Sequence, residues 1–310
     1  MSELLTVSAA PHIQTKNSTR RVMLDVLIAL APAALAGVVI FGIRALAVLA
    51  VSVAAALLSE FLFNLACRRP HTIGDLSAAV TGLLLGMNVP ANLPLWQAAV
   101  GAAFAIVVVK CLFGGLGKNF ANPAITARIF MTISFGSMTG AAFPTVVDTV
   151  ATATPLSEMK TGATNSASYL DMLLGLKGGA IGEVCAIALL LGFAYLLIRR
   201  VITWHTPVCF VGGVFLLTLL ITGNAGLALT HVLSGGLLLG AIFMATDYVT
   251  TPVTKGGRAL FGIGCALITV VIRMWGAYPE GVSFAILLMN ILTPYLERWT
   301  QPKAVGGAKA

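Results

Sequence analysis

Residues 22–66 read VMLDVLIALAPAALAGVVIFGIRALAVLAVSVAAALLSEFLFNLA, and this stretch holds only three charged side chains, Asp25, Arg44 and Glu60. A helix needs about 20 mostly apolar residues to cross a bilayer, so the stretch predicts two spanning helices, 22–43 and 45–66. Of the 310 residues, 58% are hydrophobic and 10% are charged, whereas soluble domains carry roughly 25% charged residues. We therefore expect an all-α integral membrane protein.

Eight further apolar segments continue the pattern: 76–89, 95–113, 124–143, 181–198, 207–222, 225–245, 259–274 and 281–296. About ten transmembrane helices follow, with a terminal segment at each end, 1–21 and 297–310, and a long polar connection, 144–180. The pentapeptide Gly82–Gly86 (GLLLG) recurs as Gly236–Gly240. This repeat suggests two five-helix halves, 22–143 and 181–296, which would be inverted because five is odd. A chance recurrence of Leu and Gly is the alternative.

The distribution of Lys and Arg predicts the orientation, because cytoplasmic loops carry an excess of both. With the N-terminus inside, fifteen of the 19 fall on the cytoplasmic side, including Lys110 and Arg128. The outer side keeps Arg44, Lys160, Lys177 and Arg273. We therefore expect cytoplasmic N- and C-termini and an outer 144–180 segment. The net charge of +8 follows from this asymmetry, so nucleic acid is not an expected partner, whereas membrane lipid is.

Few side chains inside the predicted spans are candidates for metal binding or ion transport. The five cysteines form no CxxC pair and the four histidines no HxxxH spacing, so a metal site is not expected. Glu60 is the one acid well inside a predicted span, and intramembrane acids are candidates for an ion path. A structural role is the alternative, because Arg68 lies only one or two helical turns away.

A glycine-rich stretch follows the fourth apolar segment: Gly114, Gly115, Gly117, Lys118 and Asn119. It lacks the Walker spacing and follows an apolar segment rather than a strand, so it is not a nucleotide loop. Either it is a tight cytoplasmic turn, or its backbone approaches a ligand closely.

Several longer motifs occur in order along the chain: Ser8–Ile13, Gly114–Ala124, Phe243–Thr254, Tyr278–Gly281 and Leu287–Pro294. On these motifs the chain resembles the family of Rnf complex D subunits and, more distantly, the B subunit of the sodium-pumping NADH:quinone reductase. The resemblance implies a bacterial inner-membrane protein of a complex that couples ferredoxin:NAD oxidoreduction to Na⁺ or H⁺ movement. It also implies the Rnf subunits A, B, C, E and G as partners, the FMN-bearing G subunit above all, and a flavin transferase for maturation.

In that family a threonine in an outer loop is esterified to the phosphate of FMN. The resemblance carries this role to Thr154 through the residues Asp148, Ala153, Pro155 and Leu156. Thr164, in the sequence TGAT, is the competing acceptor. We expect Thr154 on an exposed loop. Relatives also carry a non-covalent riboflavin, for which Gly114–Asn119 is the candidate site, and an ion path through Glu60 is the other candidate function.

One function of another class fits the composition. Two inverted helical halves can also enclose a passive channel or permease for a small polar solute. A flavoprotein is yellow when purified, whereas a channel is colourless, so purification separates the two interpretations.

Overall fold

The structure, a computed structural model, describes residues 18–139, 154–160 and 168–301, and its regular elements in these ranges are all helical. This confirms the predicted all-α class. The elements before the outer segment are α1 (Thr19–Phe41), α2 (Ile43–Ala66), η1 (Ile73–Asp75), α3 (Ser77–Met87), α4 (Leu95–Phe104), η2 (Ala105–Cys111), α5 (Pro123–Ser134) and η3 (Gly136–Thr139). Those after it begin with α6 (Pro155–Lys160), α7 (Tyr169–Leu174), α8 (Ala186–Ile198), α9 (His205–Thr222), α10 (Ala225–Leu233), α11 (Leu237–Leu239), η4 (Gly240–Met244), α12 (Lys255–Trp275) and α13 (Val282–Thr300).

Four helices in the described ranges are long and apolar enough to cross a membrane: α1, α2, α9 and α12. They coincide with the predicted spans 22–43, 45–66, 207–222 and 259–274. Gly42, with a φ of 74°, separates α1 from α2, a backbone angle that a glycine adopts at little cost.

The other predicted spans are shorter or broken helices. Three shorter apolar helices, Ser77–Met87, Leu95–Cys111 and Ala186–Ile198, occupy the segments 76–89, 95–113 and 181–198. The segment 124–143 holds the 12-residue α5 and η3, and its last four residues lie outside the described ranges. The last segment, 281–296, lies in α13, which contains Pro294. The count of ten and the two inverted halves stay predictions.

The predicted helix 225–245 is broken. Its two parts, α10 and the pair α11–η4, meet at an angle of 65°, and a fifth span results if the bent pair crosses as one. The break falls at Ser234–Gly236, where Gly235 has a φ of 68°. A helix interrupted in this way exposes backbone groups that need partners within the membrane.

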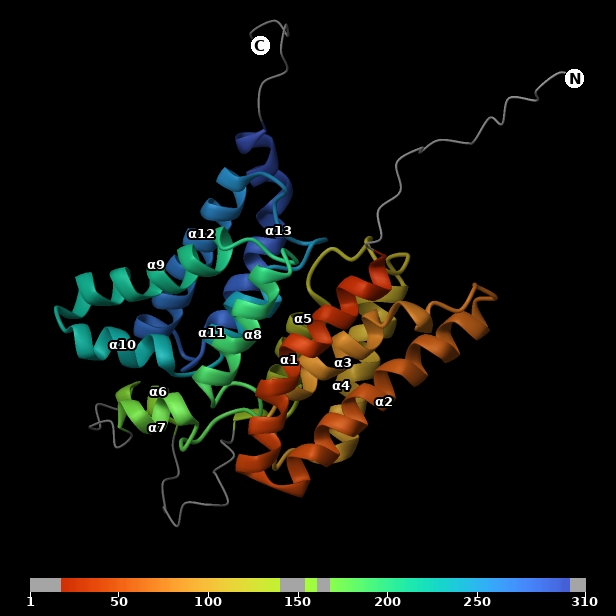
Figure 1. Ribbon diagram of the computed structural model, residues 1–310, viewed down its shortest axis with the longest axis horizontal. Coiled ribbons are helices and arrows are strands. Elements are labelled where there is room, and N and C mark those ends of the chain that lie inside the picture. The colour runs from red at the N-terminus through yellow and green to blue at the C-terminus, as the bar shows by residue number, and fades with distance from the viewer. Residues whose placement is uncertain (1–17, 140–153, 161–167, 302–310) are drawn as a thin grey trace, which may run out of the picture.

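The two ends of the bundle hold different segments (Figure 1). The start of α1 and the end of α13 lie at one end, and α6 and α7 lie at the other. We call these the inner and the outer end, after the predicted orientation. In the middle, α1 packs against α8, where a Cβ on Gly192 would collide with the carbonyl oxygen of Ala29. This close approach joins the first helix to the second half of the chain.

Candidate functional site

A cavity of about 210 Å³ opens near the outer end, and its wall includes Thr154, the predicted FMN acceptor, with Leu156 and Ser157. The remaining polar wall comes from segments far apart in the chain: Asn88, Arg128, Thr132, Glu183 and Glu280. Gly178, Gly179 and Gly235 add backbone to the wall. The cavity therefore combines a nucleophilic hydroxyl with a charged interior.

Thr154 is the N-cap residue of α6 and not a free loop residue, contrary to our expectation. Its Oγ1 accepts a hydrogen bond from the backbone N–H of Ser157 at 3.2 Å, and its carbonyl oxygen accepts from the N–H of Glu158 at 2.9 Å. Its hydroxyl also lies 3.2 Å from the Ser157 hydroxyl. Threonine is a preferred N-cap residue, and proline is favoured directly after it. The cap fixes the hydroxyl in place at the cavity.

The residues that follow the hydroxyl fasten α6 to the bundle. Pro155 and Leu156 are both buried, and the Leu156 side chain packs against Gly235, in the break between α10 and α11. The predicted site residues Asp148 and Ala153, and the competing acceptor Thr164, lie outside the described residues.

The cavity wall contains a salt bridge between two segments that are far apart in the chain. Arg128 on α5 forms a salt bridge with Glu280, in the connection before α13, and donates a hydrogen bond to Asn88 Oδ1 at 2.7 Å. The side chain of Arg128 is only 12% exposed. The sequence places Arg128 and Thr154 on opposite sides of the membrane, whereas the structure puts both in the wall of one cavity, so Arg128 is not a loop charge that sets the orientation.

Two buried cations and one partly exposed carboxylate satisfy the backbone of the broken helix. Arg273 on α12 donates to the carbonyl oxygens of His231 at 2.5 Å and Ser234 at 3.2 Å, and Lys177 donates to that of Leu233. On the other side of the break, Glu280 accepts from the N–H of Gly236.

This arrangement matches the dipoles of the two short helices, because cations favour a C-terminus and anions an N-terminus. Burial lowers the pKa of Lys177 to about 8. Lys177 and Arg273, two of the four cations that the sequence places on the outer side, are both buried in the interior of the bundle.

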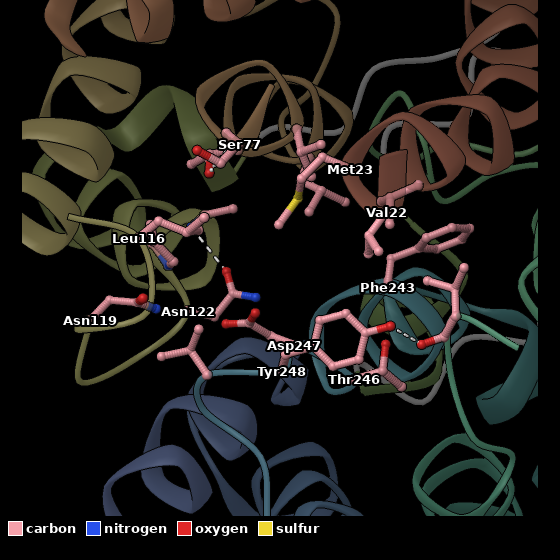
Figure 2. A pocket seen from close by; sticks show the side chains of 18 of the residues that line it. Val22, Met23, Ser77, Leu116, Asn119, Asn122, Phe243, Thr246, Asp247 and Tyr248 are labelled. Atoms are coloured by element: carbon pink, nitrogen blue, oxygen red, sulfur yellow. Dashed lines mark hydrogen bonds between the residues drawn. The ribbon is translucent and has the colours of Figure 1, made fainter. Parts of the chain in front are cut away.

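A second cavity, of about 100 Å³, lies toward the inner end between α1, α3, η2 and the segment after η4. Figure 2 shows the side chains of Asn119, Asn122 and Asp247 gathered on one side of it, with Val22 and Met23 across from them. Burial raises the pKa of the Asp247 carboxyl, although hydrogen bonds from Thr250 and Asn119 act in the opposite direction. The cavity therefore offers two amides and a carboxyl beside an apolar wall.

The glycine-rich stretch contributes to this cavity only in part. Asn119 lines it, as does Leu116, whereas Lys118 is exposed and folds over Gly114. Gly114, Gly115 and Gly117 all have positive φ, between 87° and 115°, and a Cβ on Gly115 or Gly117 would meet open space. The glycines shape the turn that carries Asn119 into the wall.

Glu60 is buried, but its partner is not Arg68. Its Oε1 accepts from Lys110 Nζ at 2.7 Å and from Thr72 Oγ1 at 2.8 Å. Lys110 Nζ also donates to Ser77 Oγ at 2.6 Å, and both Lys110 and Ser77 line the inner cavity. Lys110, assigned above to the cytoplasmic flank, thus lies in the interior, and Glu60 sits one residue behind the cavity wall.

Hydrogen-bonded side chains separate the two cavities. Asn88, in the outer wall, donates to Met244 Sδ at 3.2 Å, and Asn122, in the inner wall, donates to the Met244 carbonyl oxygen at 3.2 Å. Helix α5 connects the same two walls, because Asn122 caps its start and Arg128 follows six residues later, about 9 Å along the axis. The cavities are neighbours with a thin partition between them.

Sequence reasoning missed most of the charged residues at these sites. Arg128 and Glu280 in the outer cavity are not among the candidates, and the positions of Glu183 and Asp247 near the ends of predicted spans favour a capping role instead. A usable signal was present in the apolar setting of Arg128 and Arg273, since charged residues inside predicted spans mark functional or structural networks. Both had entered the prediction only as charges that set the orientation.

The sequence matches one family model over residues 6–306, that of the NQR2, RnfD, RnfE family. It is 46% identical to the D subunit of the Na⁺-translocating ferredoxin:NAD⁺ oxidoreductase complex of Acetobacterium woodii, over 100% of this chain and 98% of that protein.

The chain belongs to the NQR2, RnfD, RnfE family. Another member, the D subunit of the proton-translocating ferredoxin:NAD⁺ oxidoreductase complex of Clostridium ljungdahlii, is 40% identical over 98% of this chain and 96% of its own length. The D subunit of the ion-translocating oxidoreductase complex of Halorhodospira halophila is 36% identical over 99% and 96%. The membership predicted from the motifs is confirmed.

Proposed function

We propose that this chain is the D subunit of an ion-translocating ferredoxin:NAD⁺ oxidoreductase complex, and that it carries FMN on Thr154. Its membership of the NQR2, RnfD, RnfE family, whose members named above are such subunits, supports the activity. The observation that carries the flavin assignment is the capped Thr154 hydroxyl in the wall of the outer cavity.

The residues of the outer cavity fit a phosphate-bearing flavin. Arg128 adds a guanidinium that is paired with Glu280 but has five N–H donors to share with an anion, and the three glycines line the same cavity as Thr154. Tyr278 and Phe284 are stacked with their ring centroids 5.2 Å apart, which gives the cavity a flat apolar surface. When bound, FMN supplies the electron-transfer chemistry, and the protein supplies position and electrostatics.

A phosphoester at Thr154 is compatible with the cap. The ester oxygen would still accept from the N–H of Ser157, whereas the hydrogen bond that the hydroxyl donates to Ser157 Oγ is lost. The attachment point therefore stays fixed by α6, whose Leu156 is anchored on Gly235.

For the inner cavity we propose a non-covalent flavin without a phosphate, namely riboflavin. Asp247 presents a carboxyl, and the Asn119 and Asn122 amides, held by hydrogen bonds to Ala121 and Met244, complete a polar wall that can face the polar edge of a flavin ring. Lys110, the one cation among the described residues of this wall, donates to both Glu60 and Ser77, so the inner wall has no guanidinium to share with a phosphate, unlike the outer wall. These charges favour riboflavin over FMN.

The two sites form a short electron route through the membrane domain, along α5 and through the Asn88–Met244–Asn122 partition. The same partition argues against a passive channel, because hydrogen-bonded side chains fill the space between the cavities. We assign the reactions of ferredoxin and NAD to subunits A, B, C, E and G. The G subunit would face residues 144–180, and a flavin transferase would load Thr154.

The proposed setting is the bacterial cytoplasmic membrane, with ten spans, both termini inside and α6 outside. The translocated ion is Na⁺ or H⁺, the two ions named for the relatives from Acetobacterium and Clostridium. Glu60, buried with Lys110 next to the inner cavity, is our candidate for the ion path.

Three variants test the flavin assignment: Thr154→Ala, Thr154→Ser and Thr164→Ala. After expression with a flavin transferase and denaturing electrophoresis, we expect Thr154→Ala to lose its ultraviolet fluorescence and Thr164→Ala to keep it. Thr154→Ser removes only a methyl group and is expected to retain some fluorescence. Fluorescence that persists in Thr154→Ala and disappears in Thr164→Ala would reverse the assignment.

A further inference from the structure

Three charged groups from the wall of the outer cavity converge on the backbone of Gly236, next to the wall residue Gly235. A Cβ on this residue would lie 2.8 Å from Glu280 Oε1, 3.1 Å from Arg128 Nη1 and 3.3 Å from Glu183 Oε2. Two of these groups have partners, because Glu280 binds Arg128 and the N–H of Gly236. The absence of a side chain at Gly236 lets the third, Glu183, approach them.

Glu183 has one oxygen engaged and one free. Its Oε1 accepts from the N–H of Ala180 at 2.9 Å, whereas its Oε2 is buried and has no hydrogen-bond partner among the described residues. The residue is only 8% exposed and lies in the cavity wall that also holds Thr154. An unpartnered buried carboxylate oxygen is costly, and the cost falls when the oxygen binds a proton.

The charges around Glu183 decide how readily its carboxyl binds a proton. Glu183 is buried, the carboxylate of Glu280 and the guanidinium of Arg128 approach the same point of the backbone, and Lys177 adds a second nearby cation. Negative charge added to the cavity would act in the same direction as Glu280, because a like charge disfavours the ionised form.

We propose that Glu183 takes up a proton at Oε2 when electrons enter the outer cavity, and releases it when they leave. This inference rests on the proposed flavin at Thr154, which brings the electrons to this wall. For each pair of electrons delivered by the reductant, one proton from solvent forms an O–H bond at Oε2. Glu280 stays ionised because it is paired with Arg128. On reoxidation the electrons leave the cavity and the proton on Oε2 returns to solvent.

The test measures proton uptake by the purified full-length protein with its covalent flavin. A chemical reductant is added in small steps, the flavin absorbance gives the extent of reduction, and a pH indicator gives the protons taken up. In Glu183→Gln we expect about one proton fewer per flavin than in the wild type, with a correspondingly weaker pH dependence of the midpoint potential. Protons bound by the flavin itself are common to both proteins and cancel.

Glu297→Gln is the matched control, because it makes the same change on α13 at the inner end of the bundle, where Glu297 accepts from the N–H of Val253. Its proton uptake should equal that of the wild type. Equal uptake in Glu183→Gln and the wild type, with the flavin present in both, would overturn the inference. A wild-type protein without covalent flavin would instead overturn the proposed function.

If Glu183→Gln does not fold, a second measurement on the wild type tests whether Glu183 takes up the proton. The infrared difference spectrum of the wild type, reduced minus oxidised, should show the carbonyl stretch of a newly protonated carboxyl, shifted in heavy water. Absence of this band would show that Glu183 does not take up the proton.

Discussion

Replacing Arg273 by methionine should destabilise the bundle at the break between α10 and α11. The guanidinium donates to the carbonyl oxygens of His231 and Ser234, and hydrogen bonds to charged groups contribute about 1.5–3 kcal/mol each. Part of this is offset, because a buried cation no longer has to be desolvated. We expect a net loss of about 2–4 kcal/mol in the free energy of unfolding.

The assay is thermal or denaturant unfolding of the purified protein in detergent, followed by circular dichroism. Arg298→Met is the control, because Arg298 is exposed in the last turn of α13, and exposed substitutions usually stay within about 0.5 kcal/mol. Arg273→Lys should recover part of the loss by keeping one donor. If Arg273→Met and Arg298→Met unfold alike, the guanidinium does not hold the broken helix together.

Three further predictions concern packing, pH and the inner cavity. Gly192→Ala should lower the free energy of unfolding by about 1–3 kcal/mol, because the added methyl collides with the carbonyl oxygen of Ala29. Gly212→Ala is the control and should leave stability unchanged, because its added methyl meets open space. Equal melting temperatures for the two variants would contradict the α1–α8 packing. Since Lys177 has its pKa lowered to about 8 when folded, the unfolded chain binds more protons above that pH, so wild-type stability should rise between pH 8 and about 10 and Lys177→Met should lose this rise. Asp247→Asn should alter the retention of riboflavin without affecting the covalent flavin, as measured by extraction and chromatography; unchanged retention would remove Asp247 from that site.

The sequence was sufficient for the elements whose signal is local. Hydropathy located α1, α2, α9 and α12, because a lipid-facing helix needs a long apolar run. The Ser234–Gly236 sequence also carried a signal for the break in 225–245, since consecutive glycines interrupt helices, although hydropathy alone made this segment continuous. The N-cap at Thr154 could have been recognised from the Thr-Pro sequence.

The charged partners could not be predicted, because they are far apart in the chain. Glu60 pairs with Lys110, 50 residues away, and Arg128 pairs with Glu280, 152 residues away. No hydrophobic period encodes such pairs, since they depend on how the helices pack. Counting Lys and Arg for orientation therefore included cations that serve the interior.

The attachment of FMN to Thr154 can be tested most directly on the wild-type protein by peptide mass spectrometry. Trypsin cuts after Lys and Arg, so the two candidate threonines fall on separate peptides: Thr154 on residues 129–160 and Thr164 on residues 161–177. We predict that the 129–160 peptide carries the added mass of FMN less one water, with fragment ions that assign it to Thr154. The same added mass on the 161–177 peptide, or an unmodified mass for both, would contradict the account.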